Sequence, residues 1–461
     1  METEPNLPTS HNHENGKTSD HVIAISTEAS EWLASLEDKI SKMPKLLNKT
    51  AGKSSCCIFR VPKSLAQINE KAYQPHIVSI GPYHHGNDQF QMIEEHKWRF
   101  LGAVLTRTKA KDISLDDFFK AIAPKEEEIR ECYSENIGYS SHQLIEMMIL
   151  DGCFIIELLC IVARLVQTHL DDPIFNMAWM FSFLMRDLLR LENQIPFFVL
   201  ESLFGLVSVT LDDSSRSLTE LALEFFDYAV ERPAEFLDRF KDKKGKHLLD
   251  LFRSTFIPPP QGKPNEDAYS PFLQLIQSAK KLRLSGIKFK PKRTDSFLDI
   301  SFSHGVLRIP PLTVDDFTSS FLLNCVAFEQ CYKHCSKHIT SYVTFMGCLI
   351  NTPADAGYLS DHRIIENYFG TDDEVAKFFN DVGKDITFDI QRSYLSKLFK
   401  DVNKYYRNNF HIKWAGFKHT YFDSPWSFMS AMAALILLVL TIIQAFFAVY
   451  PYASPSHKQS N

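Results

Sequence analysis

The sequence lacks the short motifs that mark the common enzyme classes. It contains no G-x-S-x-G elbow, P-loop, G-x-G-x-x-G turn, H-E-x-x-H helix, C-x-x-C pair or EF-hand loop. It also has no run of Lys and Arg, and its formal net charge is −6. A general nucleic-acid binder carries a basic patch, so this composition argues against that class. We therefore expect no nucleic-acid partner, no cofactor and none of the familiar enzyme activities.

A secretory signal and a disulfide framework are also missing. Residues 1–20 are polar and acidic and have no apolar core. The nine cysteines are an odd number without framework spacing, which indicates reduced thiols in a cytosolic protein. We predict a disordered segment over residues 1–22, followed by a helix and a linker over 23–56. Asn48 begins a glycosylation triplet that is usable only if this part of the chain is lumenal.

One stretch near the C-terminus lacks charge altogether. Residues 427–450 contain no Asp, Glu, Lys, Arg or His. A helix of this length would measure roughly 36 Å, against a hydrocarbon core of about 30 Å. We predict one transmembrane helix over 427–450 and a short tail over 451–461. Insertion after synthesis would leave the head in the cytosol, and the choice between plasma membrane and endomembrane stays open. The charge bias agrees, since Arg407, Lys413 and Lys418 precede the span and only Lys458 follows it.

The rest of the chain has the composition of a globular protein, with 45% hydrophobic and 23% charged residues. A capping box at Ser140–Gln143 opens a long apolar helix, and the carboxylates of Asp151 and Glu157 place that helix in a soluble core rather than a bilayer. Residues 297–309 predict a β-hairpin that turns at Gly305. The proline-rich stretch 256–271 predicts an internal boundary or an exposed loop. The predicted fold is mainly α: a large helical globular domain with a small β element of hairpin and short strands, plus one C-terminal transmembrane helix.

Several longer runs carry a family resemblance. They are IFRVP (58–62), YQPHIVSIGPYHHG (73–86), LDGCFIIELL (150–159), LENQIPFFVL (191–200), LRIPPLTVDD (307–316), AFEQC (327–331), ITSYVTFM (339–346) and YFDSPW (421–426). In this order they resemble the plant family defined by the domain of unknown function 247 (DUF247), also called the UPF0481 proteins. The resemblance implies a membrane-anchored plant protein with a globular domain over 57–424 and no assigned activity. Some relatives are associated with self-incompatibility in grasses, which suggests recognition, and the family supplies no catalytic residues.

The loop Tyr83–Gly86 is the first candidate site. Its adjacent His84 and His85, with His76 nearby, can bind a metal ion or exchange protons near neutral pH. Alternatively, they cap backbone groups and fix the loop on the head. We favour the second interpretation because no Asp, Glu or Cys lies at ligand spacing beside them.

Four zinc-compatible residues form a second candidate, although we expect no metal site. Cys331, His334, Cys335 and His338 would lie in a line on a single helix, where a tetrahedral ion reaches two of them and rarely three. A site would need the helix to break near Lys337 or a ligand from elsewhere. The alternative is a buried Cys331 and a partly exposed His334. We interpret four acidic pairs as helix or turn caps: Asp171–Asp172, Asp212–Asp213, Asp315–Asp316 and Asp372–Asp373.

The polar residues of the predicted span share one helix face. This face steps by four and three residues through Ser430, Ala434, Leu437, Thr441, Gln444 and Ala448, which is the spacing of packed helices. We predict that it associates with a second copy or with the span of a partner. The alternative is a lipid-facing helix in which Gln444 lies near enough to the interface to stay hydrated.

Three functional hypotheses remain from the sequence. The first is a membrane-anchored protein that takes part in protein–protein recognition or signalling. The second is a hydrolase or transferase of an unrecognised class that uses His84 or His85 as its base. The third is a structural scaffold that clusters membrane proteins.

Overall fold

The computed structural model describes residues 17–42, 47–67, 69–167, 171–211, 215–230, 232, 234–259, 273–408 and 425–453. The chain divides into two units, residues 1–49 and 50–461. The first unit contains α1 (Lys17–Ser41), which begins before the predicted start at residue 23. Residues 1–16 of the segment predicted to be disordered lie outside the described residues.

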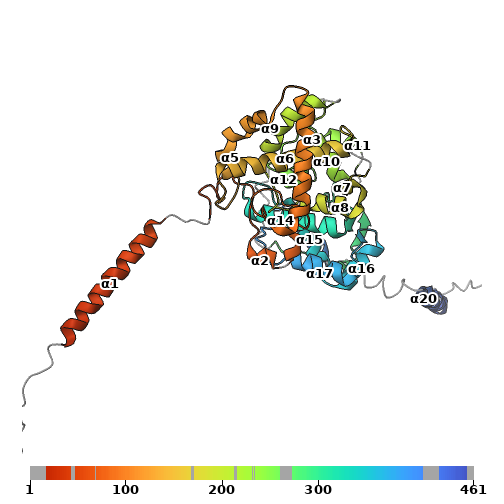
Figure 1. Cartoon of the computed structure of the whole chain (residues 1–461). Coiled ribbons are helices and arrows are strands. Elements are labelled where there is room, and N and C mark those ends of the chain that lie inside the picture. Colours follow the sequence, from red (N-terminus) through yellow and green to blue (C-terminus); the bar gives the residue numbers. More distant parts are fainter. Residues whose placement is uncertain are drawn as a thin grey trace, which may run out of the picture. The chain divides into compact units, whose positions relative to one another are not determined.

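The N-terminal half of the head is helical and is built around α6 (Ser141–Val162). Ser140 caps this helix with Gln143, as the sequence predicts, and almost every residue from Leu144 to Cys160 is buried. Helix α3 packs along α6 and also contacts α9 (Figure 1). The other helices here are α2 (Lys63–Ala66), α3 (Gln91–Lys109), α4 (Leu115–Ile122), α5 (Glu126–Glu131), α7 (Pro173–Asn176), α8 (Ala178–Asp187), α9 (Phe197–Val207), α10 (Leu218–Asp227), α11 (Ala234–Asp238) and α12 (Leu248–Ser254), with short 3-10 turns at Glu70–Ala72, Asp88–Phe90, Ala123–Lys125 and Ser208–Thr210.

The carboxylates inside α6 explain how a long apolar helix belongs to a soluble head. Asp151 lies 2.6 Å from Lys97 Nζ, and Glu157 pairs with Arg107. Both cations come from α3, which packs along α6. A buried carboxylate needs such a partner, so the charges that argue against a membrane span also fix the register of α3 on α6.

The C-terminal half adds six helices and two small sheets to the described part of the head. The helices are α13 (Ala279–Leu284), α14 (Asp316–Cys331), α15 (His338–Leu349), α16 (Pro353–Asp361), α17 (Asp372–Val382) and α18 (Ser396–Tyr406). The first sheet has the order β1 (Lys288–Pro291), β3 (Val306–Ile309), β2 (Ser301–Ser303); β1 is parallel to β3, and β2 is antiparallel to it. The predicted hairpin is therefore confirmed as β2–β3, with a left-handed Gly305 (φ 72°) at its turn. The second sheet pairs β4 (Leu312–Val314) with β5 (Ile365–Asn367) in parallel.

The C-terminal helix α20 (Pro425–Ala453) is apolar and exposed. Among the described residues it is the one helix long and apolar enough to cross a membrane, over Met429–Val449, and none of that stretch is buried. An apolar helix of this length with no protein cover indicates single-pass membrane association. Most of the predicted proline-rich boundary, residues 260–271, lies outside the described residues.

Candidate functional site

The histidine loop is held by buried side chains from a distant part of the chain. The carboxylate of Asp187, at the end of α8, accepts hydrogen bonds from the backbone N–H groups of His76, Ile77 and Val78, at 2.9, 2.8 and 3.2 Å from Oδ2. Arg190 donates from Nε to Asp187 Oδ1 at 2.9 Å. Three N–H groups and a guanidinium stabilise this buried charge, so the backbone of the loop is fixed.

The neighbouring residues of the LENQIP run continue the same network. Asn193 accepts from the N–H of Ile80 at 2.7 Å and donates to the carbonyl of Val78 at 3.1 Å. The N–H of Gly81 donates to Asp151 Oδ2 at 2.7 Å. Gly81 has a φ of 73°, and a Cβ there would lie 2.7 Å from the carbonyl oxygen of Gln194. The turn therefore requires glycine.

His84 is paired with a carboxylate that the sequence does not place beside it. Its Nε2 lies 3.1 Å from Glu192 Oε2, and Arg60 Nη1 lies 3.1 Å from the same oxygen. The N–H of Val61 donates to Glu192 Oε1 at 2.8 Å. Burial raises the pKa of Glu192, but the nearby His84, the hydrogen bond from the N–H of Val61 and the charge of Arg60 outweigh it and leave that pKa below its usual value. His84 thus fixes the loop through a carboxylate, whereas the sequence suggested capping of backbone groups.

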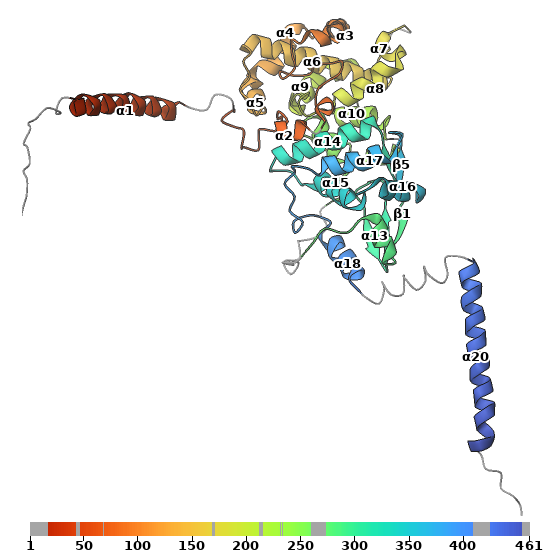
Figure 2. The same ribbon diagram turned by 90° about the horizontal axis from the view of Figure 1, so that it is seen from below.

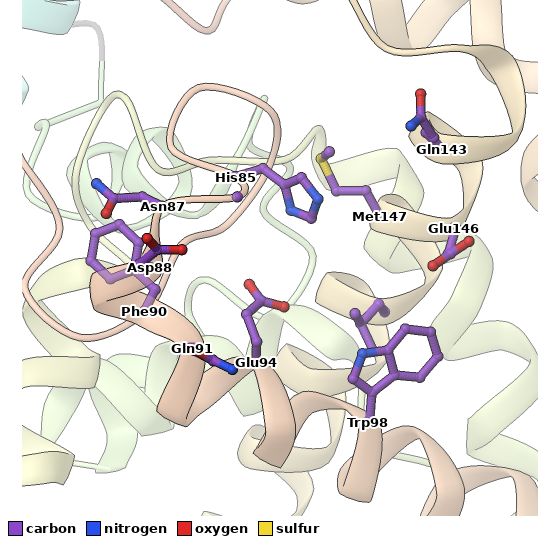
Figure 3. Close-up of a pocket in the computed structure, with 12 residues that line it drawn as sticks. His85, Asn87, Asp88, Phe90, Gln91, Glu94, Trp98, Gln143, Glu146 and Met147 are labelled. Atoms are coloured by element: carbon purple, nitrogen blue, oxygen red, sulfur yellow. The ribbon is translucent and has the colours of Figure 1, made fainter.

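The next residue, His85, lines a groove between the loop, α3 and α6 (Figure 3). The ring of His85 packs edge-on against Tyr139, with centroids 5.5 Å apart. The groove has a volume of about 620 Å³, which is within the range of small-ligand sites. It is lined by His85, Gly86, Asn87, Asp88, Phe90, Gln91, Glu94, Trp98, Gln143, Glu146, Met147 and Leu150.

The lining of this groove is acidic and aromatic. Its carboxylates are Asp88, Glu94 and Glu146, and no Lys or Arg lines it. Glu94 is partly neutralised by Lys97 Nζ at 2.6 Å, whereas no described residue pairs with Asp88 or Glu146. The indole of Trp98 is 51% exposed and, like Glu94 and Glu146, borders the open space in Figure 3. Such a lining can hold a cation by charge and by contact with an aromatic face.

Of the residues that line this groove, the sequence pointed only to His85 and Gly86 of the histidine loop. Trp98 follows Glu94 by four residues on α3, and Met147 follows Gln143 by four residues on α6. These are ordinary intervals on one face of a helix, and they could have suggested two solvent-facing stripes. That the two stripes border the same space depends on how α3 packs on α6.

The four zinc-compatible residues do not meet. Helix α14 ends at Cys331 and α15 begins at His338, so the chain between them is not helical. His338 stacks on Tyr394 with centroids 4.7 Å apart, and burial lowers its pKa to about 4. Cys335 Sγ donates to the carbonyl of Tyr332 at 3.2 Å, and burial raises the thiol pKa of Cys335 and of Cys331 to about 12. No group of three or more His, Cys, Asp and Glu side chains in the described part of the chain can hold a metal ion.

Of the four acidic pairs, three lie at the start of a described helix. Asp172 accepts from the N–H of Ile174 at the start of α7, and Asp315 accepts from the N–H of Thr318 at the start of α14. Asp372 and Asp373 lie in the first turn of α17, while residues 212–214 lie outside the described residues.

On α20, Thr441 Oγ1 donates to the carbonyl of Leu437 at 2.7 Å, within its own helix. The association face of α20 therefore stays a prediction.

Comparisons with known proteins find the family that the sequence runs resemble, and the match covers almost the whole head. The family model DUF247, described as "Plant protein of unknown function", matches residues 58–440. The chain is 43% identical over 444 residues to UPF0481 protein At3g47200 of Arabidopsis thaliana, covering 91% of this chain and 92% of that protein. It is 23% identical over 485 residues to a second Arabidopsis thaliana UPF0481 protein, At3g02645, covering 85% and 90%. No solved structure matches.

Proposed function

The chain belongs to the plant DUF247 family, whose function is unknown, and we propose that this member is a membrane-anchored recognition protein whose head binds a cationic segment of a partner protein. In this proposal, α20 holds the head at a bilayer. The observation that carries the proposal is the groove beside His85. It combines an exposed indole with carboxylates that no described residue neutralises.

The chemistry of the groove favours a lysine or arginine side chain as its occupant. A cation over an indole ring gains about 0.5 to 2 kcal/mol, and the carboxylates of Glu146 and Asp88 add charge complementarity. The buried side chains of Phe90, Met147 and Leu150 offer an apolar floor for the methylene stem of the cation. A volume of about 620 Å³ also accommodates residues that flank the cation.

Selection of displayed random peptides against the full chain in nanodiscs tests this proposal. We expect the selected peptides to be enriched in Lys or Arg. Trp98→Ala should weaken their binding by about 2- to 30-fold, because that is the equilibrium factor for a lost cation–π contact. Trp179→Ala is the matched control, since Trp179 is similarly exposed, at 47%, and does not line the groove. Peptides without basic enrichment, or equal loss in both variants, would refute the proposal.

The enzyme hypothesis receives less support from the same geometry. His84 is engaged with Glu192 in the network that fixes the loop. The groove beside His85 is lined by no Ser, Thr or Cys, so it offers no hydroxyl or thiol for covalent catalysis. Acid–base chemistry by His85 and the carboxylates would need a substrate that supplies its own nucleophile or uses water.

The span offers a second point of association. In lipid, helices associate through small residues and interhelical hydrogen bonds worth roughly 0.6 to 2 kcal/mol each, and the amide of Gln444 needs such a bond if it is away from the interface. We expect Gln444→Leu to reduce association of α20 in a membrane two-hybrid or crosslinking assay. Leu440→Gln serves as the control off this face. Unchanged association in Gln444→Leu would leave the face as an ordinary lipid-facing surface.

A further inference from the structure

Positive charge is concentrated in two segments of the C-terminal half of the head. Residues 273–308 contain eight Lys and Arg and two Asp, a net charge of +6. Residues 396–407 contain four Lys and Arg and one Asp, a net charge of +3. The chain as a whole carries −6, so these two segments differ in sign from the remainder.

The two segments lie against each other. Asn403 Nδ2 of α18 donates to the carbonyl of Gln274 at 2.6 Å, and Arg407 Nη2 donates to Gln274 Oε1 at 2.6 Å. The ring of Tyr405 packs edge-on against Phe302 of β2, with centroids 5.8 Å apart. Figure 2 shows α13, β1 and α18 together at one end of the head. We call the exposed basic side chains of these three elements the basic face.

The lysines of the basic face are available to a ligand. Lys288 and Lys290 flank the buried Phe289 on β1, so both point away from the core. Lys400 and Lys404 lie one turn apart on α18 and are exposed. In the part of the chain that the structure describes, no ion pair engages any of these four lysines. The face therefore presents uncompensated charge.

Exposed apolar side chains accompany the charge. Leu284, one turn after the exposed Lys281 on α13, is 62% exposed, and Leu275 is 45% exposed. Lysines on the edge strand β1 would by themselves protect it from pairing with another sheet. That role explains neither the lysines of α18 nor the leucines of α13. Basic residues beside exposed leucines are typical of surfaces that rest on lipid.

We propose that the basic face binds the anionic lipid headgroups of the membrane that holds α20. In the sequence, α18 is the last described helix before α20, so the anchor keeps this face at a high local concentration near the bilayer. Each Lys or Arg near an anionic surface contributes about 1 kcal/mol, or about a fivefold change in equilibrium. Leu284 and Leu275 then enter the interfacial layer. This contact orients the head and leaves the groove beside His85 for a protein partner.

Hydrogen exchange of the full chain in nanodiscs tests the proposal. We expect the amides of α13 and β1 to exchange about fivefold more slowly when phosphatidylserine is mixed into phosphatidylcholine than in phosphatidylcholine alone. About 1 M salt, where the Debye length is about 3 Å, should remove the difference. The double substitution Lys288→Glu and Lys290→Glu should also remove it. These exposed edge positions leave the core unchanged, and retained exchange protection of α6 would verify that the variant is folded.

Lys109→Glu with Lys111→Glu is the matched control, because it reverses the charge of two exposed lysines, one at the end of α3 and one just after it. This control should keep the lipid-dependent protection. Equal exchange in the two lipid mixtures would overturn the proposal. Protection by a single-stranded oligonucleotide on neutral nanodiscs, without protection by phosphatidylserine, would overturn it in favour of nucleic acid.

Discussion

Replacing Lys97 with alanine should destabilise the head by about 3 to 5 kcal/mol, the usual cost of leaving a buried charge without its partner. Lys97 is buried, and its Nζ contacts Asp151, Glu94 and the carbonyl of Ser79. Without that ammonium, the carboxylate of Asp151 stays in the core with only the N–H of Gly81 beside it. The loss should appear as a lower denaturant midpoint of the full chain in detergent.

The pH dependence of this loss identifies its cause. Burial already raises the pKa of Asp151 in the folded head, and Lys97 opposes that rise. Removal of Lys97 raises the folded pKa further above the unfolded value. Protonated Asp151 is tolerated in the core, so the destabilisation should be small near the unfolded pKa and grow as the pH increases toward the folded pKa.

Two controls complete the experiment. Adding Asp151→Asn to Lys97→Ala removes the buried charge while keeping an oxygen acceptor for Gly81, so it should restore part of the lost stability. Lys109→Ala, on the exposed end of the same helix, should change stability by no more than about 0.5 kcal/mol. A loss in Lys97→Ala no larger than that in Lys109→Ala would contradict this role for the buried pair.

Removing residues 425–461 should release the head from membranes after a high-salt wash. The twelve Leu, Ile, Val and Phe residues between 427 and 450 favour insertion by roughly 4 to 7 kcal/mol. At low salt, the basic face should still hold part of the truncated head on anionic membranes, since that contact is electrostatic. The measurement is sedimentation of the full chain and of the truncated chain with anionic membranes at low and at high salt. It separates anchoring by α20 from electrostatic binding by the basic face.

A shorter truncation provides the control for this prediction. Removal of residues 454–461 leaves α20 intact and should leave the protein in the membrane fraction at both salt concentrations. If the longer truncation still sediments after the high-salt wash, the head has another apolar anchor and α20 is not the main one.

The features that the sequence predicted well depend on neighbouring residues. The capping box at Ser140 involves side chains three residues apart, and the β2–β3 hairpin is set by the turn at Gly305. The apolar stretch of α20 can be identified from its own residues, without knowing what it packs against. In each case the stabilising contact is local, so the order of residues is sufficient to predict it.

The features that escaped prediction depend on packing between distant segments. β5 was not predicted, because its pairing partner β4 lies on the other side of α14, α15 and α16 in the sequence. His84 seemed to lack an acidic partner, yet the loop that follows α8 brings Glu192 to it. The groove needs both Trp98 of α3 and Glu146 of α6. Such contacts follow from how helices pack, and residue spacing alone does not contain them.

Recognition of a cationic partner segment by the groove is the central claim, and the affinity of one groove-selected peptide tests it most directly. The measurement compares that peptide with a version in which its key lysine is replaced by norleucine, which keeps the stem and removes the ammonium. We predict that the full chain in nanodiscs binds the lysine peptide more tightly than the norleucine peptide. Glu146→Gln should reduce this difference in affinity, because the norleucine replacement and Glu146→Gln remove charge from the same contact. Equal affinity for the two peptides would contradict the claim.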